Sequence, residues 1–142
     1  MKNNLLNYLT LIVVLVSCPI LILIYLKAGS PVNIYTYVGI ALMIPSLILF
    51  TIARIQLGSS FQVTAKANKL VTSGIYKKLR HPIYLFGGIF LLGAIVFIQK
   101  FFLIIFLAGI IFLQKGRIKN EEKVLEEKFG EQYLNYKKNT WF

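Results

Sequence analysis

Uncharged stretches dominate the pattern of apolar and polar positions along the chain. Residues 5–26 and 34–53 hold no acidic or basic side chain, and as α-helices both are long enough to cross a hydrocarbon core about 30 Å thick. Residues 83–99 and 101–113 are also uncharged, and only Lys100 separates them. These two stretches are shorter, so we interpret them as a helical hairpin that crosses with little tilt or thins the bilayer. The pattern predicts about four transmembrane helices.

The polar segment that follows the last apolar stretch predicts an amphipathic helix. This segment holds every acidic residue of the chain, and Gly130 interrupts it. It lies on the membrane surface or closes over the end of the hairpin. Its apolar and aromatic residues recur at spacings of one, three and four positions, and they are Val124, Leu125, Phe129, Tyr133 and Tyr136.

Composition supports a membrane protein of one domain. The chain has 142 residues, of which 57% are hydrophobic, and its mean hydropathy is +0.70, above the range of soluble proteins. No internal repeat or long linker divides it, so we expect an all-α integral membrane bundle over residues 1–142. We also expect Gly87, Gly88 and Gly93 to let the third helix pack closely against the fourth, where Gly109 lies. Nothing in the sequence specifies an oligomeric state.

The distribution of positive charge predicts the topology. The formal net charge is +11, and with four spans all Lys and Arg residues except Lys27 and Lys100 fall on one side. Because Lys and Arg near a span stay on the cytoplasmic side, both termini and the loop between the second and third spans should be cytoplasmic. Anionic lipid headgroups then account for the basic character, and no nucleic-acid partner is needed.

Two small polar sets flank the predicted hairpin. Arg80 and His81 precede it, and Arg117 and Glu121 follow it four residues apart. Each set alone has an ordinary explanation, as a helix start before Pro82 or as a surface ion pair. The hairpin brings its two ends together, so their joint position favours a pocket open to both water and lipid. A Cys/His metal site is excluded, because the chain has one Cys and one His far apart in sequence.

Two strings around the hairpin carry a family resemblance. They are LVTSGIYKKLRHPIY over residues 70–84 and RIKNEEKVLEEKFGEQYLNYKK over residues 117–138. Together they resemble the isoprenylcysteine carboxyl methyltransferase family over roughly the C-terminal half to three-fifths of the chain. The resemblance implies an integral membrane enzyme that uses S-adenosylmethionine on the cytoplasmic side. It also implies a lipophilic or prenylated acceptor that enters from the bilayer.

The resemblance assigns a cofactor region to residues 68–84 and 117–121. Arg117 matches the arginine that holds the acceptor's carboxylate, and Glu121 matches an acidic cofactor contact. The proline-containing stretch that usually follows YKK in the family is absent from the sequence, which leaves closure of the pocket and the acceptor open. The other implied cofactor-binding residues are Asn68, Lys69, Leu70, Val71, Tyr76, His81, Pro82, Ile83 and Tyr84.

The residue types of the chain are consistent with methyl transfer to a carboxylate, and three alternative functions remain open. A carboxylate is ionised at neutral pH and needs no general base, which suits a chain with one His and no Asp. We therefore assign no catalytic residue and treat His81 as a cofactor contact. The first alternative is an amine acceptor, as in phospholipid N-methyltransferases, for which His81 would accept a proton. The others are a sterol-reductase-like enzyme that uses NADPH and a non-enzymatic protein whose basic loop binds anionic lipids.

Overall fold

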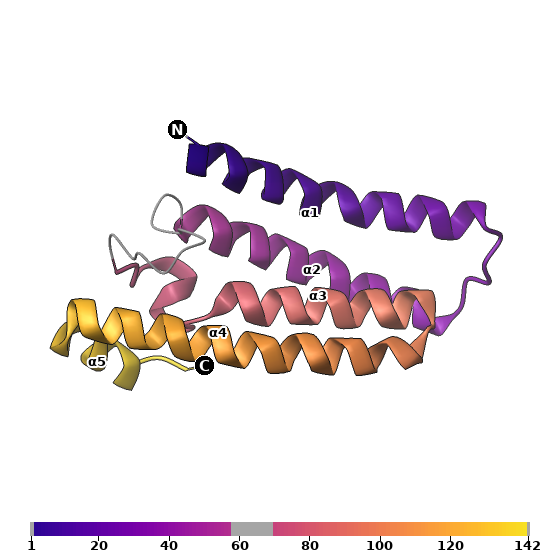
Figure 1. The fold of residues 1–142 in the computed structure, drawn as a ribbon. Coiled ribbons are helices and arrows are strands. Elements are labelled where there is room, and N and C mark those ends of the chain that lie inside the picture. The colour runs from indigo at the N-terminus through magenta and orange to yellow at the C-terminus, as the bar shows by residue number, and fades with distance from the viewer. Residues whose placement is uncertain (1, 58–69, 142) are drawn as a thin grey trace.

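The computed structural model describes residues 2–57 and 70–141; within the first helix it describes the side chains of residue 12 and of residues 15 onward. Asn68 and Lys69 lie outside the described residues. The fold is an elongated bundle of helices that run side by side (Figure 1). All the described elements are helical, as the sequence predicts. The long helices are α1 Lys2–Lys27, α2 Ile34–Leu57, α3 Pro82–Ile98 and α4 Ile104–Phe129, and the short ones are η2 Gly74–Lys77, η3 Phe101–Leu103 and α5 Glu131–Lys138.

Helices α2 and α3 form the closest helix pair. A Cβ atom added to Gly39 of α2 would lie 2.6 Å from the Cα of Phe97, and one added to Gly93 of α3 would lie 2.9 Å from the Cβ of Leu42. The side chain of Met43 fills the core beside this contact and is fully buried. Glycine therefore permits an approach that any larger residue would block.

This contact corrects the packing partner expected for the glycines of the third helix. Gly93 packs against α2, and a Cβ at Gly87 would contact Phe50 of α2. Gly88 and Gly109 have open space around them. Gly87 and Gly93 thus serve the α2–α3 pair, and the glycines of α3 do not bring this helix close to α4.

A polar clamp ties three segments together at the turn between α3 and α4. Gln99 ends α3 with a positive φ of 57°. Its Nε2 donates to the hydroxyl of Tyr25 at 2.9 Å, and its Oε1 accepts from Nδ2 of Asn33 at 3.0 Å. The clamp joins the end of α1 and the start of α2 to the hairpin turn, because each group finds its partner on another segment.

The predicted hairpin is confirmed, but its second helix is longer than expected. Helix α4 continues without interruption from the apolar stretch into the charged segment and ends at Phe129. The amphipathic helix expected after the last span is therefore a continuation of α4. The helical conformation is interrupted at Gly130, which has a positive φ of 50°, and α5 then folds back beside α4 (Figure 1).

The apolar helices indicate a membrane protein. Within the described residues, two helices are long and apolar enough to cross a membrane, Ile34–Leu57 and Phe101–Phe129, and Leu15–Lys27 and Pro82–Ile98 are shorter apolar helices. The outer face of α4 exposes large apolar side chains such as Phe112, which is 76% exposed. A continuous face of this kind is unfavourable in water and suits contact with lipid.

We predict that Gly39→Ala destabilises the bundle and that Gly88→Ala does not. The added methyl group at Gly39 meets the backbone of Phe97, so overpacking should lower the free energy of unfolding by about 1–3 kcal/mol. Gly88 lies on α3 with nothing within 4 Å, and alanine there should be neutral or slightly stabilising because of its higher helix propensity. Thermal unfolding followed by circular dichroism in detergent measures both. Equal midpoints for the two variants would contradict the close contact.

Candidate active site

The polar end of the bundle brings together η2, the first turn of α3 and the charged half of α4. The turn η2 is held against the end of α2, because the backbone N–H of Ile75 donates to Oε1 of Gln56 at 2.8 Å. Pro82 is the first residue of α3 and needs no hydrogen-bond acceptor there. The predicted site residues on these elements therefore meet at one end of the molecule.

Tyr84 and Glu121 form the central pair of the site. The Tyr84 hydroxyl donates to Oε1 of Glu121 at 2.5 Å and joins α3 to α4. Arg117 is exposed and makes no ion pair with Glu121 within the described part of the chain, so the i, i+4 surface pair is not formed. Tyr84 also lies within electrostatic range of Arg117 and of Arg54. The pair thus leaves the guanidinium of Arg117 available at the edge of the site.

Tyr76 supplies a buried hydroxyl beside this pair. The residue is 5% exposed, and its hydroxyl has no hydrogen-bond partner among the described residues. Burial raises the pKa of Tyr76 far above its ordinary value, so the group stays protonated. A buried polar group without a partner is rare in folded proteins. This hydroxyl can donate to, or accept from, a bound ligand.

His81 is buried and points toward α4. It is 7% exposed, and its Nε2 lies 3.3 Å from Oε1 of Glu122. Burial lowers the pKa of His81 more than the neighbouring carboxylates of Glu122 and Glu121 raise it. The ring is therefore neutral at neutral pH, and this contact assigns the proton to Nε2.

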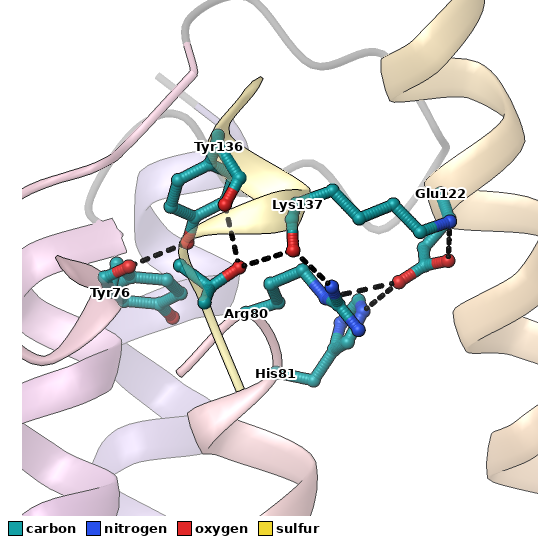
Figure 2. Close-up of polar contacts among 7 residues, drawn as sticks. Tyr76, Arg80, His81, Glu122, Tyr136 and Lys137 are labelled. Atoms are coloured by element: carbon teal, nitrogen blue, oxygen red, sulfur yellow. Dashed lines mark hydrogen bonds and ion pairs between the residues drawn. The ribbon is translucent and has the colours of Figure 1, made fainter. Parts of the chain in front are cut away.

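Glu122 gathers three basic side chains, as Figure 2 shows. Besides His81, its Oε1 lies 3.3 Å from Nε of Arg80, and its Oε2 accepts from Nζ of Lys137 at 2.7 Å. The carboxylate is only 18% exposed, and its cationic partners favour the ionised form. Successive residues of an α-helix point about 100° apart. The adjacent glutamates of α4 therefore serve different partners, Glu121 on one side and Glu122 on the other.

The C-terminal segment covers the stretch that carries Tyr76 and His81. The hydroxyl of Tyr136 donates to the backbone carbonyl of Tyr76 at 2.6 Å. The backbone N–H of Trp141 donates to the carbonyl of Lys78 at 2.8 Å, and the N–H of Arg80 donates to the carbonyl of Trp141 at 3.3 Å. The sequence allowed the charged segment to lie on the membrane surface or to close over the end of the hairpin. Helix α5, at the end of this segment, takes the second position.

The remaining residues implied by the resemblance contribute mainly backbone and apolar surface. Leu70 and Val71 precede η2 and are partly buried. Pro82 is fully buried, and Ile83 beside it is partly buried. Their position next to Tyr76 and His81 agrees with a shared site.

Sequence reasoning missed four residues at this end of the bundle. Arg54, in the last turn of α2, lies within electrostatic range of Tyr76, and it is the sole charged residue of α2. An ionisable residue in an apolar helix is a signal for a functional site. Glu122, Tyr136 and Lys137 gave no comparable signal, because their partners lie far away in the sequence.

We predict that stability falls with pH because of His81, starting as the pH drops toward the ordinary histidine pKa of 6.5 and continuing below it. A folded-state pKa below the value of 6.5 for exposed histidine means that the folded chain takes up this proton less readily than the unfolded chain. Its contribution to stability is therefore complete above the unfolded pKa and is lost as the pH falls through the folded pKa. His81 is the chain's only histidine, so the thermal midpoint of the wild type should fall more than that of His81→Gln. Parallel losses would contradict the burial of His81.

Comparison with known proteins finds similarity to methyltransferases. The family described as phospholipid methyltransferase matches residues 34–132. The chain is 33% identical over 113 residues to the protein-S-isoprenylcysteine O-methyltransferase of Dictyostelium discoideum, with 74% of this chain and 47% of that protein covered. It is 35% identical over 94 residues to the protein of the same name from Schizosaccharomyces pombe, with 62% of this chain and 40% of that protein covered.

The family match over residues 34–132 includes all of the first string, residues 70–84, and most of the second, residues 117–138. The chain spans less than half the length of these two relatives. The relatives confirm the similarity to isoprenylcysteine methyltransferases, and the extent of the family match shows that the chain belongs to the phospholipid methyltransferase family.

Proposed function

We propose that this protein transfers a methyl group from S-adenosylmethionine to the carboxylate of a lipophilic, isoprenylcysteine-like acceptor. The observation that carries the proposal is the Tyr84–Glu121 pair, with the buried hydroxyl of Tyr76 and the exposed guanidinium of Arg117 around it. A negative and a positive group at one site suit a cationic cofactor and an anionic acceptor. The names of the two relatives support the same chemistry.

The residues present fit the cofactor. When bound, S-adenosylmethionine supplies an electrophilic methyl group on a positively charged sulfur. Glu121 offers a carboxylate for the cofactor's amino group or ribose hydroxyls, and the hydroxyl of Tyr76 offers a further partner. We assign the cofactor site to residues 68–84 and 117–121, including the backbone at Leu70 and Val71 and the start of α3.

Arg117 is proposed to hold the carboxylate of the acceptor. A guanidinium binds a carboxylate through two parallel hydrogen bonds, which fixes its orientation. Leu113 lies one helical turn before Arg117 on the same side of α4 and is 68% exposed. A lipophilic tail can therefore follow the apolar half of α4 while its carboxylate meets Arg117.

The reaction in this site depends on positioning. The carboxylate oxygen must lie about 3–3.5 Å from the methyl carbon in line with the bond that breaks. An ionised carboxylate has no proton to lose, so the reaction needs no general base. His81 therefore acts as a neutral contact within the cofactor site and not as a base. The charges of the two reactants cancel in the transition state, which a site shielded from water favours.

Topology follows from the charge distribution. We propose that α1, α2, α3 and the apolar half of α4 cross the membrane, and that both termini and the site face the cytoplasm. The lipid surface and a prenylated acceptor are the partners that this arrangement requires.

A second candidate is N-methylation of a lipid amine. The family description, phospholipid methyltransferase, favours it. In that case His81 would accept the proton that the amine loses, and Arg117 would have no carboxylate to bind. The effect of changes at Arg117 separates the two reactions.

We predict that Glu121→Gln weakens binding of S-adenosylmethionine at least tenfold, about 1.4 kcal/mol. The substitution keeps the shape of the side chain and removes the charge that complements the cofactor. Glu126→Gln on the same helix is the matched control, because Glu126 is exposed, and it should bind as the wild type does. Titration calorimetry of the detergent-purified chain measures both, with NADPH as a second ligand. A folded wild type that binds NADPH and not S-adenosylmethionine would favour the reductase.

We predict that Arg117→Gln raises the KM for a farnesylcysteine analogue at least tenfold and leaves the Kd for S-adenosylmethionine within about twofold, under 1 kcal/mol. The variant loses the bidentate contact to the acceptor. Lys119→Gln removes the same charge from a neighbouring exposed position and is the control. Equal effects of the two variants would indicate attraction to anionic lipid, which depends on summed charge. An unchanged KM in Arg117→Gln would favour the amine acceptor.

A further inference from the structure

We propose that α5 closes the cofactor site and that Lys137 and Tyr136 are positioning residues for His81 and Tyr76. The proposal rests on the proposed function, because His81 and Tyr76 are there assigned to the cofactor. The sequence left open how the pocket is closed, and α5, at the end of the second family string, is the segment that we assign to this role. Neither α5 residue is required to touch the cofactor.

Lys137 acts on His81 through Glu122. The ammonium group of Lys137 lies 2.7 Å from Oε2 of Glu122, and Nε2 of His81 lies 3.3 Å from Oε1 of the same carboxylate (Figure 2). Lys137 therefore holds one oxygen in a position that leaves the other directed at the imidazole. Without Lys137, Oε2 of Glu122 loses its ammonium partner, and the carboxylate is held less firmly against the imidazole of His81.

The main chain of Lys137 adds a second link to the same stretch. Its carbonyl accepts from Nη1 of Arg80 at 3.0 Å, while Nε of Arg80 lies 3.3 Å from Glu122. One guanidinium thus connects α5 with α4 directly before His81. The Arg80 side chain is 19% exposed, and ion pairs that are partly shielded from water are screened less than surface pairs.

Tyr136 acts on the turn that carries Tyr76. Its hydroxyl donates to the Tyr76 carbonyl at 2.6 Å, and burial raises the pKa of Tyr136 to about 12, so the donor keeps its proton. The contact fixes the backbone of Tyr76 without using the Tyr76 hydroxyl. That hydroxyl remains available for a ligand.

The position of α5 is set by packing as well as by these polar contacts. Tyr133, one turn before Tyr136 and Lys137, is only 1% exposed. Trp141 pairs its backbone with Lys78 and Arg80. The segment is therefore attached at both ends, and its two positioning residues lie between the attachments.

The test compares Lys137→Met with Lys138→Met in the full chain. Both substitutions remove one lysine charge from α5, but Lys138 is exposed and makes no polar side-chain contact within the described structure. Lys137→Met should weaken binding of S-adenosylmethionine in calorimetry at least fivefold, and Lys138→Met should leave it unchanged. Lys137→Arg should restore most of the affinity. Equal affinities of the two Met variants would overturn the proposal.

A double variant separates positioning from general destabilisation. If Lys137 acts through Glu122, Glu122→Gln combined with Lys137→Met should bind no more weakly than Glu122→Gln alone. Additive losses would overturn this route. Tyr136→Phe removes one hydroxyl with little risk to folding, and it should also weaken binding.

Hydrogen exchange in the cofactor-free chain tests the coupling independently of the proposed function. Amides of residues 76–81 should exchange faster in Lys137→Met and Tyr136→Phe than in Lys138→Met. Unchanged exchange would overturn the coupling. A wild type that binds no S-adenosylmethionine would refute the proposed function, and faster exchange in the two variants would still support the role of α5 as a support for this segment.

Discussion

The close approach of α2 and α3 at Gly39 and Gly93 is the contact on which the rest of the structure depends. Apolar side chains gain little by leaving lipid for protein, so helices in a membrane associate through close packing and polar contacts. The absence of two Cβ atoms lets the backbones meet, and Phe97 and Met43 fill the space beside them. This pair sets the start of α3 against the end of α2, where η2 is attached, and the turn after α3 returns α4 to the same end.

Charge organises the polar end once packing has brought it together. The five acidic residues of the chain all lie in the last quarter of the sequence, against 16 basic residues. Glu121 and Glu122 point to different sides of α4, and each meets partners from α3 or α5. Among the described residues, the carboxylate of Glu121 bonds to one tyrosine and is suited to a ligand, whereas that of Glu122 is shared by three basic groups and is suited to a structural role. Helix geometry points the two side chains to different sides, and the packing of α3 and α5 against α4 gives each its partners.

The proposed reaction needs little from the protein except position. An ionised carboxylate and a sulfonium cofactor require no general base, which agrees with a neutral, buried His81 engaged by Glu122. The site instead needs rigid backbone around the cofactor and an open side toward lipid. The attachment of η2 through Gln56 and Tyr136 supplies the first, and the exposed apolar face of α4 supplies the second.

The sequence by itself determined the helical class, the apolar stretches and the family, because hydropathy, charge placement and two ordered motifs are local properties of the chain. The motifs also predicted Tyr84, Glu121 and His81 as site residues, and the structure places all three at the same end of the bundle. Only the tertiary structure decided that Gly93 packs on α2, that α4 runs unbroken to Phe129, and that Glu122 meets Lys137. These features depend on which faces of distant helices meet, and helical periodicity gives the faces of each helix without giving the partner of each face.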